Sequence, residues 1–225
     1  LPLFEQGLAK IEEIVRRENI ATLPARKSVI RLASEAESAA QPAPHMQPPR
    51  LIGNTGEYGE FVLPLVVNKG GKELRMDDFT HEAGSWSLTA HESRPGHEMQ
   101  FAAMVEKGIS TARAVFAFNS VNVEGWGLYS EAEMKPYFPL EGQLCGLQFR
   151  LQRAARAFLD PMVNLGRMTP EQVKDFLMKE VVLSEAMSQQ EVDRYTFRAP
   201  GQATSYYYGY MRLQQTRERA EIALR

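Results

Sequence analysis

Two histidines, His91 and His97, lie six residues apart in a segment that otherwise has helical character, and the pair Pro95-Gly96 falls between them. On a regular helix, at about 100° per residue, the two imidazoles would point about 120° apart. Proline removes a helical hydrogen bond, and glycine tolerates backbone conformations that other residues avoid. We therefore expect a helix over 86–107 with a kink or bulge that brings both rings to one side.

These histidines are candidates for a metal site. Neutral imidazole is the commonest protein ligand for zinc, and a neighbouring glutamate, here Glu92, can act as a base toward a water activated by the metal. The spacing differs from the familiar HExxH pattern. One histidine on a helix is more often structural than a ligand, but two that flank a glutamate favour the metal site. The upstream pair His81-Glu82 is interpreted as structural or as a support for the site.

A third ligand is expected from a later segment. Glu124 and Glu131 are seven residues apart, so they share a helix face. Val123, Gly125 and Trp126 surround Glu124 in the sequence, which indicates burial, and a buried carboxylate is costly without a nearby cation. The alternative is a solvated acidic face. We predict Glu124 as the third ligand.

The composition limits the class of protein. With 225 residues, 44% hydrophobic and 24% charged, the chain is typical of a soluble globular protein. A net charge of −2 argues against nucleic-acid binding, and no run of about eighteen apolar residues predicts a membrane span. The chain opens without a signal-peptide pattern and without methionine, so it could be a piece of a longer protein. Cys145 is the single cysteine, so no internal disulfide is possible, and periplasmic and cytoplasmic locations both stay open.

The N-terminal part is expected to be a helix followed by a connector. Apolar residues recur at helical spacing over 4–18, and the proline-rich stretch 41–49 suits an extended connector rather than a helix or an inner strand. This stretch is the best boundary in the chain. We therefore expect residues 1–50 to be the end of a helical region and residues 51–225 to be the main domain.

A β-hairpin is expected next, and helices after it. Residues 61–67 form a β-rich run in which Pro64 lacks a ladder donor and so favours an edge strand, and glycines within 68–72 indicate a turn back through 73–76. The fold class is therefore mainly α with a small edge β-hairpin. Besides 86–107, the expected helices are 121–134, 144–165, one that starts at the capping box Thr169–Gln172, 184–197 and 202–225.

Three ordered segments resemble the bacterial domain of unknown function 885 family. They are His91-Glu92-x-x-Pro95-Gly96-His97-x-x-Gln100, Glu124-Gly125-Trp126-x-Leu128-Tyr129-x-Glu131 and Arg194-Tyr195-x-x-x-x-Pro200-Gly201-Gln202-Ala203-x-x-Tyr206-x-x-Gly209. The resemblance covers roughly 56–225 and is specific for the family but not for a substrate. That family is grouped with gluzincin-type zinc metallopeptidases. The resemblance therefore implies a zincin-like helical catalytic domain, the C-terminal portion of a longer protein, with an edge strand along the cleft and the metal between two helices.

The resemblance also implies roles for single residues. His91, His97 and Glu124 would bind Zn²⁺, although manganese, cobalt or nickel could use the same ligands. Glu92 would be the general base that takes a proton from the hydrolytic water and passes it to the leaving amine. A second donor to the oxyanion is expected from the C-terminal segment.

Tyr206 is our first candidate for that donor, and Arg194 and Tyr195 are its rivals. The alternative for the tyrosines of this helix is a place in the core or the cleft wall. The strand predicted over 61–67 could bind an extended peptide by β-augmentation. Three further residues are expected to orient the imidazoles, namely Glu98, Gln100 and Glu131. Three arginines are more consistent with a salt-bridged helix face than with a substrate clamp, namely Arg150, Arg153 and Arg156.

The sequence thus predicts a zinc-dependent hydrolase, a peptidase that cleaves a peptide or a small amide with metal-activated water. Hydrolysis of another amide or an ester is one alternative. A non-catalytic metal-binding scaffold domain is another. Substrate preference, endo- or exo-action and oligomeric state stay open.

Overall fold

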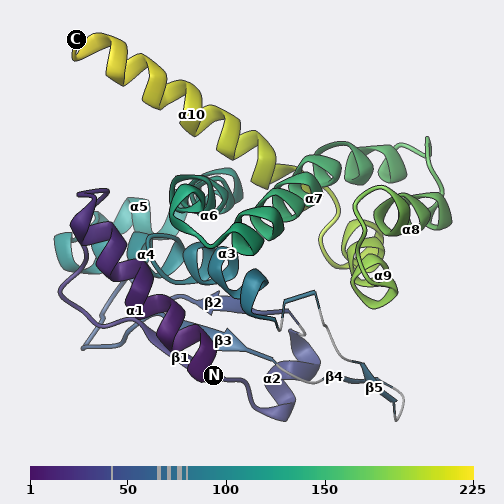
Figure 1. Cartoon of the computed structure of the whole chain (residues 1–225), viewed down its shortest axis with the longest axis horizontal. Helices are drawn as coiled ribbons and strands as arrows, with labels where there is room; N and C mark the ends of the chain where they lie inside the picture. Colours follow the sequence, from purple (N-terminus) through teal and green to yellow (C-terminus); the bar gives the residue numbers. More distant parts are fainter. Residues whose placement is uncertain (42, 65–66, 70–71, 75–77, 80) are drawn as a thin grey trace.

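The computed structural model describes residues 1–225 except 42, 65–66, 70–71, 75–77 and 80. The fold is mainly α with a small sheet, as predicted from the sequence (Figure 1). The longer helices are α1 (Pro2–Arg17), α3 (Glu82–Glu92), α4 (His97–Lys107), α6 (Ser120–Met134), α7 (Leu140–Asn164), α8 (Pro170–Lys179), α9 (Glu185–Asp193) and α10 (Ser205–Ala223). Shorter elements are α2 (Glu35–Ala40), α5 (Thr111–Phe116), the turns Lys135–Tyr137 and Gln202–Thr204, and the π-helical turn η2 (Arg194–Arg198).

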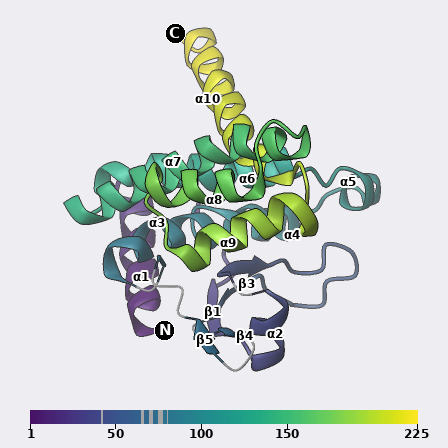
Figure 2. The ribbon, with the colours of Figure 1, turned by 90° about the vertical axis from the view of Figure 1, so that its right-hand side faces the viewer.

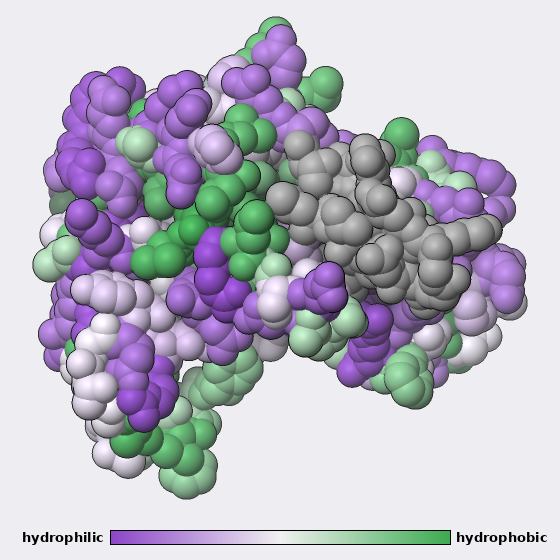
Figure 3. All heavy atoms as spheres, turned by 90° about the horizontal axis from the view of Figure 1, so that it is seen from below, coloured by the Kyte–Doolittle hydropathy of each residue, from purple (hydrophilic) through white to green (hydrophobic). Residues whose placement is uncertain are grey.

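The elements lie in layers. Helices α6 and α7 lie on one side of α3 and α4, and the sheet lies on the other side (Figures 1 and 2). Seen from the sheet side, apolar residues gather in a patch on the left part of the face, with hydrophilic residues above and below it (Figure 3). The outer half of α10 extends away from the rest of the molecule. None of the described helices combines the length and the apolar character that a membrane crossing requires.

Helix α1 confirms the N-terminal prediction. Its apolar residues recur every three or four positions, so they form one face, and that face is buried against α3. Ile11 and Val15 on this face are fully buried. This packing fixes the position of α3, which carries His91.

The three-stranded sheet has the order β1-β3-β2 and corrects the predicted strand 61–67. Strand β3 (Glu60–Leu63) is central: β1 (Val29–Leu32) pairs parallel to one side and β2 (His45–Gln47) antiparallel to the other. Pro64 follows the last residue of β3, so its missing N–H removes no donor from this ladder. The edge strands are β1 and β2. Strand β2 lies inside the stretch predicted as an extended connector, and its backbone is extended as expected.

A hairpin is present near the predicted place, formed by β4 (Val67–Lys69) and β5 (Lys72–Leu74), which pair antiparallel. Its first strand is not the predicted run 61–67, whose residues 61–63 belong to β3. Its glycine turn and part of the return lie outside the described residues. The division of the chain at residue 50 stays a prediction, but β1 and β2, from the first part, share a sheet with β3, from the second.

The prediction of a single helix over 86–107 is wrong. The structure has two helices, α3 and α4, separated by a break at 93–96. Gly96 explains the break, because an added Cβ there would collide with the carbonyl group of His91, whose carbon would be 2.5 Å away. The sharp turn at this position therefore needs a glycine.

The later helices agree better with the sequence. Helix α6 matches 121–134, and α8 starts at the predicted capping box, in which Thr169 and Gln172 exchange hydrogen bonds. Helix α7 starts earlier than predicted, at Leu140. The helix predicted over 184–197 ends at Asp193 and continues as η2, and the last helix is preceded by a 3₁₀ turn.

Helices α6 and α10 cross at two glycines. An added Cβ on Gly125 would lie 2.6 Å from the Cα of Gly209, and one on Gly209 would lie 2.7 Å from the Cα of Gly125 and closer still to the carbonyl oxygen of Val121. Only glycine permits such a close approach of the two backbones. The crossing holds the start of α10 beside the segment of α6 that carries Glu124.

Candidate metal centre

The break between α3 and α4 places both histidines at one point. His91 belongs to the last turn of α3, and His97 is the first residue of α4. Their ring centroids are 4.6 Å apart, with the ring planes at 83°. The rings therefore converge, as the sequence analysis expected, although the cause is a helix break and not a bulge.

Helix α6 holds the break in place. The indole N–H of Trp126 donates to the carbonyl oxygens of Pro95 and Gly96, at 3.0 and 3.2 Å, and the hydroxyl of Ser130 donates to Pro95 at 3.3 Å. The carbonyl of Gly96 also accepts the backbone N–H of Gln100 at 3.1 Å, whereas the carbonyl of Pro95, at the break, is satisfied by these side-chain donors. They also bring Glu124, on the same helix, to the two imidazoles.

Glu124 faces both rings. Its Oε2 lies 3.6 Å from Nε2 of His91 and 3.4 Å from Nε2 of His97. One potential ligand atom from each of these three residues lies within 4.8 Å of the other two. Gly127 provides room for this arrangement, because a Cβ there would be 2.5 Å from Cε1 of the His91 ring. The three residues predicted as metal ligands are thus brought together.

Glu131 supports His91 from behind. Nδ1 of His91 donates to Oε1 of Glu131 at 2.7 Å, and Arg153 donates to the same oxygen at 3.3 Å. Burial alone would raise the pKa of Glu131, but the positive charge of Arg153 and the bond from His91 hold it below the usual value. A carboxylate on the outer nitrogen of a metal-ligating imidazole fixes the orientation of the ring and raises its basicity.

The charges in the site favour a cation between the three residues. Burial would lower the pKa of His91, yet its bonds to Glu124 and Glu131 raise it to about 9, so the imidazole holds a proton in the metal-free protein. Burial would raise the pKa of Glu124, and the two imidazoles hold it well below the usual range. A divalent cation would take the place of that proton and pair with the same carboxylate.

The two other residues expected to orient the imidazoles do not contact them. Glu98 accepts a hydrogen bond from Arg94 at 2.7 Å, and the side-chain amide of Gln100 donates to Asn122 at 3.0 Å. Among the described residues, Nδ1 of His97 has no hydrogen-bond partner. Of the three predicted supports, only Glu131 has the predicted contact.

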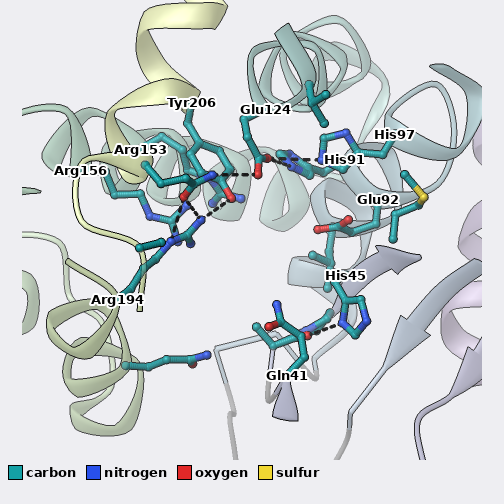
Figure 4. A pocket seen from close by; sticks show the side chains of 18 of the residues that line it. Gln41, His45, His91, Glu92, His97, Glu124, Arg153, Arg156, Arg194 and Tyr206 are labelled. Carbon is teal, nitrogen blue, oxygen red and sulfur yellow. Dashed lines mark hydrogen bonds and ion pairs between the residues drawn. The ribbon is translucent and has the colours of Figure 1, made fainter. Parts of the chain in front are cut away.

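The centre opens into a cavity of about 510 Å³, hereafter the pocket. Figure 4 shows His91, Glu92 and His97 on one side of it and, on the other, Tyr206 with Arg153, Arg156 and Arg194. The carboxylate of Glu92 is directed into the pocket, next to the two histidines. Ligand-binding cavities have volumes in this range.

Edge strand β2 forms a further wall of the pocket. His45 and Met46 line it, as do residues of the preceding loop. Since β2 pairs with β3 along one edge only, its other edge is not used by this sheet. The strand beside the pocket is therefore β2, and not the run 61–67 that the sequence analysis selected.

Tyr206 lies across the pocket from Glu92. Its ring is stacked on that of His91, with the centroids 6.1 Å apart, and its hydroxyl oxygen accepts a hydrogen bond from Arg194 at 2.9 Å. Burial raises the pKa of this phenol, so it keeps its proton. Tyr195 does not line the pocket: it is fully buried and its hydroxyl donates to Glu191 at 2.7 Å.

Gln202 joins the two sides of the site, a role that was not predicted from the sequence. Its side-chain oxygen Oε1 accepts a hydrogen bond from Nε of Arg194 at 3.1 Å. Its side-chain nitrogen Nε2 donates to Glu124 at 3.3 Å and to Ser120 at 2.9 Å. The sequence signal that could have identified Gln202 is its position directly after Pro200-Gly201, because a Pro-Gly pair of this kind ends one helix before the next begins.

The arginine stripe on α7 is ion-paired, as predicted, but it is buried. Arg153 pairs with Glu131 at 3.3 Å and Arg156 with Glu191 at 2.6 Å, and both line the pocket. Arg150 instead lies over the ring of Tyr210, 5.4 Å from its centroid. The upstream His81 is structural: it caps α3 by accepting the N–H of Gly84 at 3.1 Å.

Comparisons with known proteins agree with this fold. A family model described as "Bacterial protein of unknown function (DUF885)" matches residues 1–225. No curated protein matches the chain. Two solved structures are similar: "putative lipoprotein from Colwellia psychrerythraea" (TM-score 0.77, 24% identity, 97% of this chain and 37% of that one) and "putative lipoprotein of unknown function from Shewanella oneidensis" (TM-score 0.75, 23% identity, 98% and 39%). The chain thus spans less than two fifths of either protein, and at these identities the likeness shows the fold alone.

Proposed function

We propose, from the premise that this chain belongs to the DUF885 family of bacterial proteins, that it is a zinc-dependent hydrolase of peptide bonds. One observation carries the proposal. The two imidazole nitrogens lie 3.4 and 3.6 Å from one oxygen of Glu124, and ligands about 2.1 Å from a tetrahedral zinc ion are separated by about 3.4 Å. Both of these separations are close to that spacing, and this supports zinc as the ion.

The donor set also suits zinc chemically. Two imidazoles and one carboxylate are the protein ligands of many catalytic zinc sites, which keep another position for water or substrate. Zinc bound by His91, His97 and Glu124 would supply a Lewis acid that lowers the pKa of water and polarises a carbonyl group. Manganese, cobalt and nickel accept the same ligands.

The residues around the donors have the chemistry that hydrolysis needs. Glu92 lines the pocket beside both histidines, so its carboxylate can accept the proton of the attacking water and deliver it to the leaving amine. The phenol of Tyr206 accepts from Arg194, which leaves its own proton free for the oxyanion of the tetrahedral intermediate. Arg194 acts here by positioning Tyr206 and by withdrawing charge from its oxygen.

Strand β2 favours a peptide as the substrate. Its unpaired edge lies along the pocket, and an extended peptide can add to such an edge through main-chain hydrogen bonds. The gluzincin-like grouping of the family is part of this proposal. Because both structural neighbours are described as lipoproteins, we place the protein in the bacterial envelope rather than the cytoplasm as part of the same proposal.

Metal analysis and a peptide-library digest test the proposal together. The wild-type protein should bind one zinc per chain and cleave peptides, and Glu92→Gln should keep the zinc and lose about 1,000-fold or more in kcat. Glu82→Gln is the matched control, since Glu82 also follows a histidine in α3 but lies outside the pocket lining; it should cleave like the wild type.

Each other outcome contradicts part of the proposal. Stoichiometric zinc without cleavage that depends on Glu92 would leave a metal-binding scaffold. Cleavage of esters or other amides, with peptides untouched, would change the substrate class. Absence of bound zinc after zinc is supplied would contradict both the zinc-dependent hydrolase and the metal-binding scaffold.

A further inference from the structure

The side of the pocket opposite the histidines carries a surplus of positive charge. Four arginines line the pocket, namely Arg153, Arg156, Arg194 and Arg198. Arg153 and Arg156 are neutralised by their ion pairs with Glu131 and Glu191. The two remaining arginines have no carboxylate of their own at hydrogen-bonding distance among the described residues.

The acids that line the pocket do not cancel this surplus. Glu191 accepts both bonds of Arg156 and the hydroxyl of Tyr195, and its nearest approach to Arg194 is 3.9 Å. Glu92 and Glu124 lie at the metal centre, where a divalent cation would balance their two charges. Two guanidinium charges are then left for a bound ligand.

Arg194 keeps part of its hydrogen-bonding capacity. Its Nε and Nη2 donate to Gln202 and Tyr206. Nη1 makes only the 3.9 Å ion pair with Glu191 among the described residues, so both of its protons are available. The side chain is about one quarter exposed, which leaves this edge open to the pocket.

Arg198 lies one turn further along and has greater freedom. It lines the pocket, is exposed, and makes no side-chain hydrogen bond or ion pair with any residue that the structure describes. Arg194 and Arg198 are the first and last residues of the π-helical turn η2, which is closed by the bond from the N–H of Ala199 to the carbonyl of Arg194 at 2.9 Å. Short π-helical turns within α-helices are frequent at functional sites.

We propose that Arg194 and Arg198 bind the free C-terminal carboxylate of the substrate, so that the enzyme removes residues from the C-terminal end of short peptides. This inference rests on the proposed hydrolase function. Guanidinium groups recognise carboxylates through short, charge-assisted hydrogen bonds. A carboxylate held at this end, with the scissile carbonyl at the metal centre, sets the number of residues released and excludes bonds in the middle of a long chain.

An equilibrium binding experiment tests the inference without turnover. Calorimetry on zinc-loaded Glu92→Gln protein would compare N-acetyl-trialanine as the free acid, the same peptide as the C-terminal amide, and an amide whose last residue is glutamate. The acid should bind about tenfold or more tightly than either amide. Adding Arg198→Gln should abolish most of this preference and leave the affinity for the trialanine amide unchanged. Arg219→Gln, on the outer part of α10, is the matched control and should change nothing.

Several results would overturn the inference. Equal affinities for acid and amide, or a preference that survives Arg198→Gln, would exclude a carboxylate site at η2. Binding of the glutamate amide as tightly as the acid would mean that the anion is a side chain, which removes the exopeptidase assignment. In the peptide digest with the wild-type protein, cleavage of acid and amide alike at internal bonds would refute the inference and leave the hydrolase in place. Acid-selective binding without cleavage of any peptide would instead contradict the proposed function.

Discussion

A single methyl group at Gly209 should separate α6 from α10 and impair the site. In Gly209→Ala the new Cβ would lie 2.7 Å from the Cα of Gly125, with the backbone nitrogen of Gly125 at 3.1 Å and the carbonyl oxygen of Val121 nearer than either. Carbon atoms in contact prefer about 3.5 to 4.0 Å. All three obstacles are backbone atoms and cannot rotate away, so the helices must move apart by about 1 Å.

Two effects follow from that displacement. Overpacking of this kind costs about 1 to 3 kcal/mol of stability. The displacement also reaches the site, because Glu124 adjoins Gly125 and Tyr206 lies one turn before Gly209. A misplacement of about 1 Å can lower a rate about 100-fold. We therefore expect a loss of about 2 kcal/mol in the free energy of unfolding and about 100-fold in kcat.

Urea unfolding and peptide cleavage measure the two effects. Gly7→Ala is the matched control: Gly7 is also a buried helical glycine, but its Cβ would meet only the hydroxyl of Thr89, at an ordinary 3.8 Å. That variant should gain about 0.5 to 1 kcal/mol, the difference in helix propensity, and keep its activity. If Gly209→Ala matches the wild type in stability and in kcat, or behaves like Gly7→Ala, the reasoning from the crossing is refuted.

Two further predictions concern the buried acids. Glu131→Gln should weaken zinc affinity about 10- to 100-fold, because His91 loses its carboxylate partner, with little change in the circular dichroism spectrum. Competition with a chelating dye measures the affinity. An unchanged affinity would contradict the role of Glu131. Glu191→Gln should lower the free energy of unfolding by about 3 to 5 kcal/mol at pH 7, because Arg156 stays buried without its ion-pair partner. Burial would raise the pKa of Glu191, but Arg156 holds it at about 2, so the carboxylate stabilises the fold above an ordinary carboxyl pKa and this stability is lost as the pH falls toward 2. The difference between wild type and variant, followed by urea unfolding, should therefore shrink over that interval, and a difference independent of pH would show that the ion pair is not its source.

The fold was predictable where local rules decide it. Helix α1 and the start of α8 follow from apolar spacing and from a capping box, and neither depends on distant residues. The edge of the sheet was not predictable in this way. Pro64 marks the end of β3, and β3 is central because β1 and β2, from earlier parts of the chain, pair with its two sides.

In the candidate site, too, local features were predictable from the sequence and long-range contacts were not. The convergence of His91 and His97 with Glu124 could be expected from the sequence. The two histidines and the Pro95-Gly96 interruption lie within seven consecutive residues, so their chemistry is visible locally. The partners of these residues could not be expected in this way. Gln202 reaches Glu124 over 78 residues, and an ion pair between α7 and α9, such as that of Arg156, has no local signal in the sequence.

The helix break also makes tertiary structure a condition for metal affinity. His91, His97 and Glu124 belong to three different helices, α3, α4 and α6, whose relative placement depends on the bonds from Trp126 and Ser130. An unfolded chain would offer the same donors only as a loose chelate. A zinc ion held there would act as a cross-link among the three helices, so the denaturation midpoint should rise with the concentration of free zinc.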